Sequence, residues 1–156
     1  MLEFIESTAI ATWVRESPSI FAYTFVLSLH AIGLAIVVGV SAIVALRALG
    51  RFDQIPLAPM LKLYPVMWAG FTINTISGLM LLSANATGML SMPMFYIKMA
   101  FIVAAVVVLS LLKPRLAAGS GRVRGLSYAL LGFWLGGIVA GRLTAYPYFV
   151  NAWFGA

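Results

Sequence analysis

Residues 19–46 read SIFAYTFVLSLHAIGLAIVVGVSAIVAL and contain no aspartate, glutamate, lysine or arginine. A helix that crosses the hydrocarbon core of a bilayer needs about 20 mostly apolar residues, so this stretch is long enough to cross as a tilted helix. Three more apolar segments follow, at residues 65–84, 93–113 and 126–146. The sequence therefore predicts an all-α fold, a polytopic membrane four-helix bundle.

The composition of the whole chain agrees with a lipid environment. The chain has 156 residues, of which 63% are hydrophobic and only 9% are charged. A soluble domain has about 25% charged residues, so this chain has too few charges to cover a surface that faces water. We expect a single membrane domain, residues 1–156, whose partner is the lipid bilayer.

The segment before the first span has a different pattern. Residues 1–17 mix apolar side chains with charged ones, and they are too short and too charged to cross a membrane. We predict one amphipathic helix that lies on the membrane surface and ends at Ser17-Pro18. The segment has neither a basic beginning nor a small-residue cleavage site, so we expect no cleaved signal peptide.

The basic residues predict the orientation. They gather in the loops after the first and third spans: Arg47, Arg51 and Lys62, then Lys113, Arg115, Arg122 and Arg124. Short loops rich in lysine and arginine stay in the cytoplasm. We expect a bacterial inner-membrane protein with both termini in the periplasm. The net charge of +6 is then a signature of topology, and no nucleic acid is expected as a partner.

Two residue counts limit the chemistry. The chain has no cysteine and one histidine. The first count excludes disulfides, iron–sulfur clusters and thiolate metal sites. The second excludes a zinc site or a bis-histidine haem built from one chain alone.

Ionisable residues inside spans are costly and indicate function. Three occur here: His30 near the middle of the first span, and Lys98 and Arg142 toward the periplasmic side of the third and fourth spans. No span contains an aspartate or glutamate. A buried cation requires an anion, which a lipid phosphate, a substrate carboxylate or haem propionates would supply. The alternative is that the two cations extend to the lipid headgroups.

Small residues mark the faces of two spans. Gly70, Asn74 and Gly78 share one face of the second span because they are four residues apart, and Ser77 lies beside them. The fourth span has four glycines in GxxxG spacings: Gly132, Gly136, Gly137 and Gly141. Such faces indicate close helix packing or, alternatively, a flat cofactor pressed against the backbone.

Methionines are possible additional metal ligands. Met80 lies at about the depth of His30 when residues are counted from the cytoplasmic ends of the spans, which makes it a candidate sixth ligand of a haem iron. Met89, Met92 and Met94 gather at the start of the third span, and thioethers select Cu(I). Methionine is also an ordinary apolar filler.

Three stretches resemble known families. The first is Ser28-Leu29-His30-Ala31-Ile32-Gly33 with Arg47 at the end of the span. The second is Phe95-Tyr96-Ile97-Lys98-Met99-Ala100, and the third is Ala140-Gly141-Arg142-Leu143-Thr144-Ala145-Tyr146. Together they resemble the CopD-like copper-resistance proteins, a related small four-helix inner-membrane family of unknown function, and the membrane-type protoporphyrinogen oxidase (the HemJ kind).

The resemblance implies specific roles. In the oxidase family the corresponding histidine binds haem b, and an arginine and a lysine are important for activity. These roles fall on His30, Arg47 and Lys98. The oxidase has further histidines that this chain lacks, so the resemblance extends to haem binding rather than to the oxidase reaction.

These observations lead to one main hypothesis and two alternatives. The main hypothesis is a b-type haem protein that carries electrons between quinone in the bilayer and a periplasmic partner. His30 is the axial ligand, either Asn74 or the backbone carbonyl four residues back on the first span orients its ring, and Lys98 and Arg142 hold the propionates. The alternatives are a CopD-like copper-handling protein, and a cofactor-free subunit of a larger membrane complex or a homo-oligomer.

Overall fold

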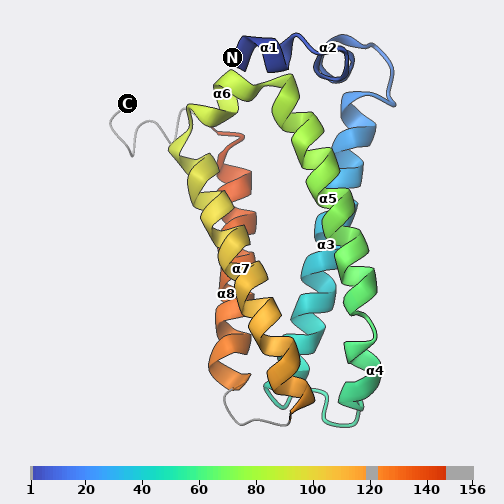
Figure 1. Cartoon of the computed structure of the whole chain (residues 1–156), viewed down its shortest axis with the longest axis vertical. Helices are drawn as coiled ribbons and strands as arrows, with labels where there is room; N and C mark the ends of the chain where they lie inside the picture. Colours follow the sequence, from blue (N-terminus) through green and yellow to red (C-terminus); the bar gives the residue numbers. More distant parts are fainter. Residues whose placement is uncertain (1, 119–122, 147–156) are drawn as a thin grey trace. The chain divides into compact units, whose positions relative to one another are not determined.

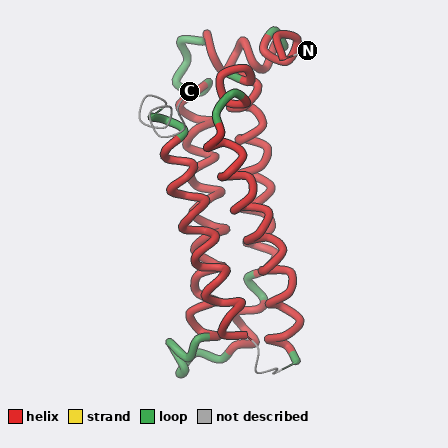
Figure 2. Tube along the Cα trace, turned by 90° about the vertical axis from the view of Figure 1, so that its left-hand side faces the viewer, coloured by secondary structure: helices red, strands yellow, loops and turns green. Residues whose placement is uncertain are grey.

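A computed structural model describes residues 2–118 and 123–146. Within these ranges the chain consists of helices and connecting loops and has no strand (Figure 2). Four helices of the described ranges are long and apolar enough to cross a membrane. The predicted all-α membrane fold is therefore confirmed, and the protein is a membrane protein.

Eight helices are labelled in Figure 1. The four long ones are α3 (Tyr23–Ala48), α5 (Tyr64–Ala84), α7 (Pro93–Ala117) and α8 (Val123–Leu143). The short ones are α1 (Leu2–Glu6), α2 (Ala9–Glu16), α4 (Leu57–Leu61) and α6 (Ala86–Leu90).

The helices divide into two compact units. The first unit joins the N-terminal segment through Val37 to Pro65–Ser91, and the second joins Val38–Tyr64 to the chain that follows Met92. In the first unit, α1 and α2 lie at the end of the α3–α5 pair where α3 begins and α5 ends (Figure 1). The main element of the second unit is the α7–α8 hairpin. The prediction of a single domain stays a prediction.

The N-terminal segment is two helices, so the prediction of one continuous helix was wrong. The break falls at Ser7-Thr8 because Thr8 is the N-cap of α2 and has an extended backbone. Its hydroxyl donates to the Ile5 carbonyl and accepts from the Ala11 N–H at 3.4 Å. A threonine that bonds to nearby main-chain groups in this way competes with helix continuation. We call α1 and α2 together the N-terminal strap.

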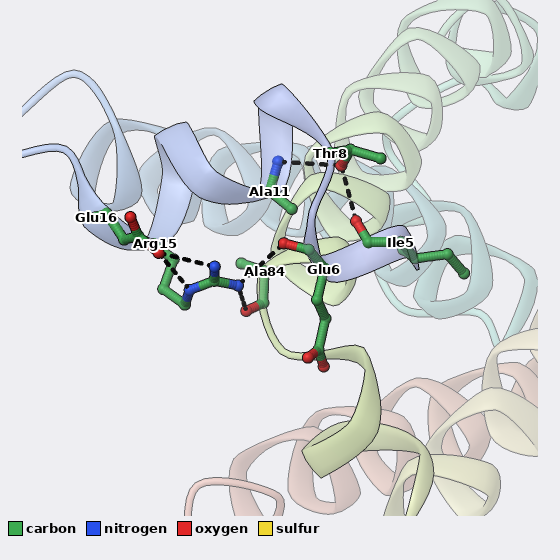
Figure 3. A network of polar contacts seen from close by, with 7 residues as sticks. All are labelled: Ile5, Glu6, Thr8, Ala11, Arg15, Glu16 and Ala84. Atoms are coloured by element: carbon green, nitrogen blue, oxygen red, sulfur yellow. Dashed lines mark hydrogen bonds and ion pairs between the residues drawn. The ribbon is translucent and has the colours of Figure 1, made fainter. Parts of the chain in front are cut away.

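Two charged side chains attach the N-terminal strap to the end of α5 and to α6. Arg15 donates to the carbonyls of Ala84, the last residue of α5, and of Glu6, the last residue of α1, and it pairs with Glu16 at 2.8 Å (Figure 3). The Glu6 carboxylate accepts the backbone N–H of Thr87 at 2.7 Å. A cation near helix C-termini and an anion near an N-terminus are both stabilising arrangements.

The long helices differ from the predicted spans at their ends. The first begins at Tyr23 rather than residue 19 because Ser19 forms a turn, in which its carbonyl and hydroxyl accept N–H groups from the next residues. The third continues past Pro114 to Ala117, although we predicted a stop there. Proline costs a helix one backbone hydrogen bond, and near the C-terminus few residues remain to be disrupted. The predicted loop at residues 85–92 contains α6.

The Glu6 contact predicts a pH dependence of the N-terminal strap. The hydrogen bond from Thr87 lowers the pKa of the Glu6 carboxyl from its ordinary value of 4.5, and Arg15 adds a smaller effect in the same direction. The contact is therefore fully present above pH 4.5 and is lost as the pH falls through the lowered pKa. We expect acid to reduce the protection of the Thr87 amide against hydrogen exchange, after correction for intrinsic rates.

Two variants make this prediction specific. Glu6→Gln should have a protection that does not change across the same pH range and is below that of the wild type at neutral pH, because an amide oxygen accepts more weakly than a carboxylate. Glu3→Gln, in the same helix, should behave like the wild type. Identical pH profiles for Glu6→Gln and the wild type would contradict the assignment.

Candidate functional site

The His30 ring lies between α3 and α5 and is half-buried. Its Nδ1 is 2.9 Å from the backbone carbonyl oxygen of Asn74. The Asn74 side chain returns the contact, because its Nδ2 donates to the His30 carbonyl at 2.7 Å. Ser77, which is buried, places its hydroxyl 3.4 Å from the same ring nitrogen. His30 and Asn74 are therefore in contact, as the sequence predicted, and each side chain bonds to the main-chain carbonyl of the other residue.

The contact with a carbonyl bears on the tautomer of the ring. A carbonyl oxygen only accepts, so the 2.9 Å contact is a hydrogen bond in the tautomer that has the proton on Nδ1 and the ring lone pair on Nε2. The longer contact of the same nitrogen with Asn74 Nδ2, at 3.3 Å, is a hydrogen bond in the other tautomer. Histidines that bind metals are typically oriented in this way, by donating the other ring N–H to a carbonyl or carboxylate. The geometry of His30 therefore fits the role of a neutral ligand through Nε2.

Glycines bring the two helices close enough for these contacts. A Cβ atom added to Gly33 would lie 2.6 Å from the backbone nitrogen of Asn74 and 2.8 Å from the Gly70 carbonyl oxygen. A Cβ on Gly78 would lie 3.0 Å from Cε1 of His30. The predicted face of small residues on the second span therefore packs directly against the first span.

A single methyl group at Gly33 should separate α3 from α5. Its nearest neighbours are backbone atoms, which cannot rotate away as a side chain can. We expect Gly33→Ala to destabilise the protein by roughly 1–3 kcal/mol, the usual cost of overpacking, and to lengthen the contact between His30 and Asn74. Thermal unfolding in detergent measures the first effect.

Gly39→Ala is the matched control, because it lies on the same helix and its added Cβ would meet nothing within 4 Å. It should be neutral or slightly stabilising, since alanine favours helix by about 1 kcal/mol over glycine. Equal melting temperatures for the two variants would show that the close approach at Gly33 is unimportant.

Met80 has the contacts of a packing residue. It lies against a buried cluster formed by Val14, Val26 and Ala84. This cluster joins the N-terminal strap to α3 and α5. The role of Met80 as a sixth iron ligand stays a prediction, and its observed contacts are those of an apolar filler.

Lys98 lies in the α7–α8 hairpin against a glycine. A Cβ added to Gly141 would lie 3.5 Å from both Cδ and Cε of Lys98 and 3.9 Å from its Nζ. The bare backbone of α8 therefore makes room for the lysine stem. Lys98 is half-buried, and the described part of the chain gives it no ion pair. The anion that it requires stays a prediction.

Arg142 follows Gly141 and is exposed. Its Nη2 lies 3.1 Å from the Tyr146 hydroxyl, and its guanidinium carbon lies 5.3 Å from the centroid of the same ring. These contacts fit an anchor at the membrane interface, where tyrosine and arginine are common. Arg142 and Lys98 belong to the second unit and His30 to the first, so a site shared by the three residues stays a prediction.

Arg47 holds the loop that follows α3. It donates to the Asp53 carboxylate at 3.0 Å and to the Ile55 carbonyl at 2.6 Å. These bonds connect the last turn of the helix to a loop in which Gly50 and Phe52 have positive φ angles. The observed role of Arg47 is structural, and the cofactor role implied by resemblance stays a prediction.

Several polar residues were not assigned a role from the sequence. Arg15 and Glu6 attach the N-terminal strap, a role that the sequence did not indicate. The Tyr64 hydroxyl and the Trp134 indole nitrogen are buried without a hydrogen-bond partner among the described residues. No sequence pattern marks such atoms, because burial depends on neighbouring helices.

The described residues contain no group of three or more histidine, cysteine, aspartate or glutamate side chains suited to a metal ion. Of the three methionines considered for copper, Met94 is buried against Ala140 in the α7–α8 hairpin.

Comparisons with protein-family models, with curated proteins and with solved structures found no match to this chain.

Proposed function

We propose that this membrane protein binds a b-type haem through His30. The observation that carries the proposal is the 2.9 Å contact between Nδ1 of His30 and the Asn74 carbonyl oxygen. It orients a half-buried imidazole inside a span and leaves the lone pair on Nε2, as an iron ligand requires. An ionisable residue at this depth is costly, and a cofactor supplies a reason for it.

The remaining residues of the proposed site have separate tasks. Asn74 and Ser77 hold the imidazole in place, and the glycines at positions 33, 70 and 78 keep α3 and α5 close. The role of Lys98 and Arg142 as partners of the two propionates is an expectation from the sequence, because both residues belong to the second unit. Arg47 stabilises the loop after α3.

Electron transfer is the activity that we assign to this site. A bound haem supplies one-electron chemistry, and the protein sets its potential through the axial ligand, burial and nearby charge. The apolar surroundings of the spans suit quinone as one redox partner. The other partner is a protein on the periplasmic side. The resemblance to the HemJ-like family supports the haem-binding part of this proposal.

An absorption spectrum tests the proposal most directly. Protein purified from cells supplied with haem should have a Soret band and reduced-minus-oxidised bands of a b-type haem. A matched preparation of an unrelated four-span protein controls for adventitious haem. Absence of the band would reject haem binding.

A cofactor-free role is the second candidate, and the glycine contacts favour it. His30, Asn74 and Gly78 also form a polar helix–helix contact, which is sufficient reason for a histidine in a span. Under this proposal the protein is a subunit of a larger membrane complex. A CopD-like copper role has less support from the contacts of Met94, and copper analysis of the purified protein tests it.

The orientation gives a further prediction. We expect both termini in the periplasm and the loops after α3 and α7 in the cytoplasm, because most of the lysine and arginine lies in these loops or in the helix ends beside them. A C-terminal alkaline phosphatase fusion should be active, and a C-terminal green fluorescent protein fusion should be dark. The opposite readout would overturn the orientation. A fusion in the loop between α3 and α5 serves as the internal control.

A further inference from the structure

The N-terminal strap covers the end of the α3–α5 pair nearest to His30. Val14 of α2 is fully buried, and it packs with Val26 of α3 and Ala84 of α5. Met80 and Leu81 lie against the same cluster. These contacts join three helices of one unit, so the strap is part of the packed structure at this end.

This cluster is the layer next to His30. Val26 lies about one helical turn before His30 on α3, and Leu81 lies about one turn after Gly78 on α5. Gly78 is itself in contact with the His30 ring. A molecule that approaches His30 from the strap end of the pair therefore has to pass the layer that Val14 closes.

Only a few polar contacts hold the strap in this position. The Arg15 guanidinium reaches the Ala84 carbonyl at 3.3 Å and the Glu6 carbonyl at 3.2 Å (Figure 3). The Glu6 carboxylate accepts from Thr87 in an exposed setting. Each of these bonds joins one charged side chain to a neutral main-chain group, and the bond to Ala84 is part-buried. The buried side chains of α2 are Ala11 and Val14. Such an attachment opens more readily than the spans unfold.

The outward side of the strap is apolar. Phe4 is 76% exposed, Ile10 57% and Trp13 42%, while Arg15 points inward to helix ends. An apolar surface of this kind suits the boundary between headgroups and acyl chains. The strap therefore remains attached to the membrane surface when its inward contacts break.

We infer that the N-terminal strap is a lid on the α3–α5 pair, and that breaking its Arg15 and Glu6 contacts admits water-soluble molecules toward His30. The inference goes beyond the proposed function and does not require that a haem is bound. The strap controls access to His30. When it is closed, Val14 seals the layer next to His30, and when it is open, small polar molecules reach that layer.

Single-cysteine variants test this inference, because the natural chain has no cysteine. Val14→Cys places a thiol inside the closed layer, and Met80→Cys places one deeper toward His30. Ser7→Cys, at an exposed polar position between α1 and α2, is the matched control. The full chain in lipid nanodiscs is treated with a charged, membrane-impermeant methanethiosulfonate reagent, and mass spectrometry gives the rate of labelling.

We expect Val14→Cys and Met80→Cys to react much more slowly than Ser7→Cys. Adding Arg15→Gln should speed both by roughly 2- to 12-fold, the change in open population that corresponds to one lost hydrogen bond. Adding Glu6→Gln, which removes the charge but keeps an oxygen that accepts from Thr87, should speed both by a smaller factor. Adding Glu3→Gln should change neither. Glu6→Gln is nearly isosteric, so it preserves the test if Arg15→Gln disturbs folding.

Three results would overturn the inference. One is equal reactivity of Val14→Cys and Ser7→Cys in the otherwise natural chain. Another is an unchanged rate for Val14→Cys when both Arg15→Gln and Glu6→Gln are present. The third is acceleration of Val14→Cys without acceleration of Met80→Cys, which would show that the strap lifts without opening a path toward His30. None of these three results depends on a Soret band. The labelling experiment can therefore reject the lid without rejecting haem binding, and the absorption spectrum can reject haem binding without rejecting the lid.

Discussion

Replacing His30 with alanine should remove the haem while the protein still inserts into the membrane. Insertion depends on the hydropathy of the four spans, which this change leaves nearly intact, whereas the chain has no second histidine to take over as ligand. The measurement is the Soret absorbance per polypeptide, together with the yield of membrane-inserted protein. We expect the absorbance to fall to background.

Two further variants separate ligation from packing. His30→Phe fills the space with a ring that has no nitrogen, and it should lose the haem as completely as His30→Ala. Added imidazole should restore part of the spectrum in His30→Ala only. Asn74→Ala keeps the backbone carbonyl that accepts from the ring, so it should weaken haem retention by about 10-fold, the lower end of such indirect effects. A wild-type spectrum in His30→Ala would exclude His30 as the ligand.

Removing the charge of Lys98 or Arg142 should weaken haem retention by roughly 10- to 100-fold. Hydrogen bonds to charged groups contribute about 1.5–3 kcal/mol net, and about 1.4 kcal/mol corresponds to tenfold in affinity. Methionine is the suitable replacement because it keeps apolar volume. The midpoint potential should also fall, since a nearby positive charge favours the reduced iron. Haem occupancy and redox titration measure the two effects.

Lys62→Met is the matched control, because Lys62 is an exposed lysine outside the four long helices and should leave both quantities unchanged. If Lys98 and Arg142 merely extend to headgroups, methionine should be neutral or slightly stabilising. Wild-type occupancy and potential in both single variants and in the double variant would reject the anion-binding role.

Hydropathy was sufficient to predict the four long helices, because each span must satisfy its backbone hydrogen bonds within itself. The same reasoning failed where a short polar side chain or a proline acts locally. Thr8 divides the N-terminal segment by bonding to main-chain groups on both sides. Pro114 was expected to end its helix, yet it lies close enough to the C-terminus for the helix to continue.

The candidate site was only partly predictable. Spacing placed Gly70, Asn74 and Gly78 on one face, and this face does meet His30. The acceptor of the ring proton is a main-chain carbonyl, which every residue possesses, so no residue type indicates it. The sequence also did not indicate that Arg15 points inward, because its partner is the main-chain carbonyl at the end of another helix.

The bond between Arg15 and Ala84 has a consequence for the order of synthesis. The two residues are 69 positions apart, so at roughly 5–20 residues per second the carbonyl is made about 3–14 s after the guanidinium. Both must then be on the same side of the bilayer, which requires that α3 and α5 have each crossed it once. The apolar side chains of the N-terminal strap therefore have to hold it at the membrane surface before its polar partners have been synthesised. The strap can bind the end of α5 only after α3 and α5 have both crossed the membrane.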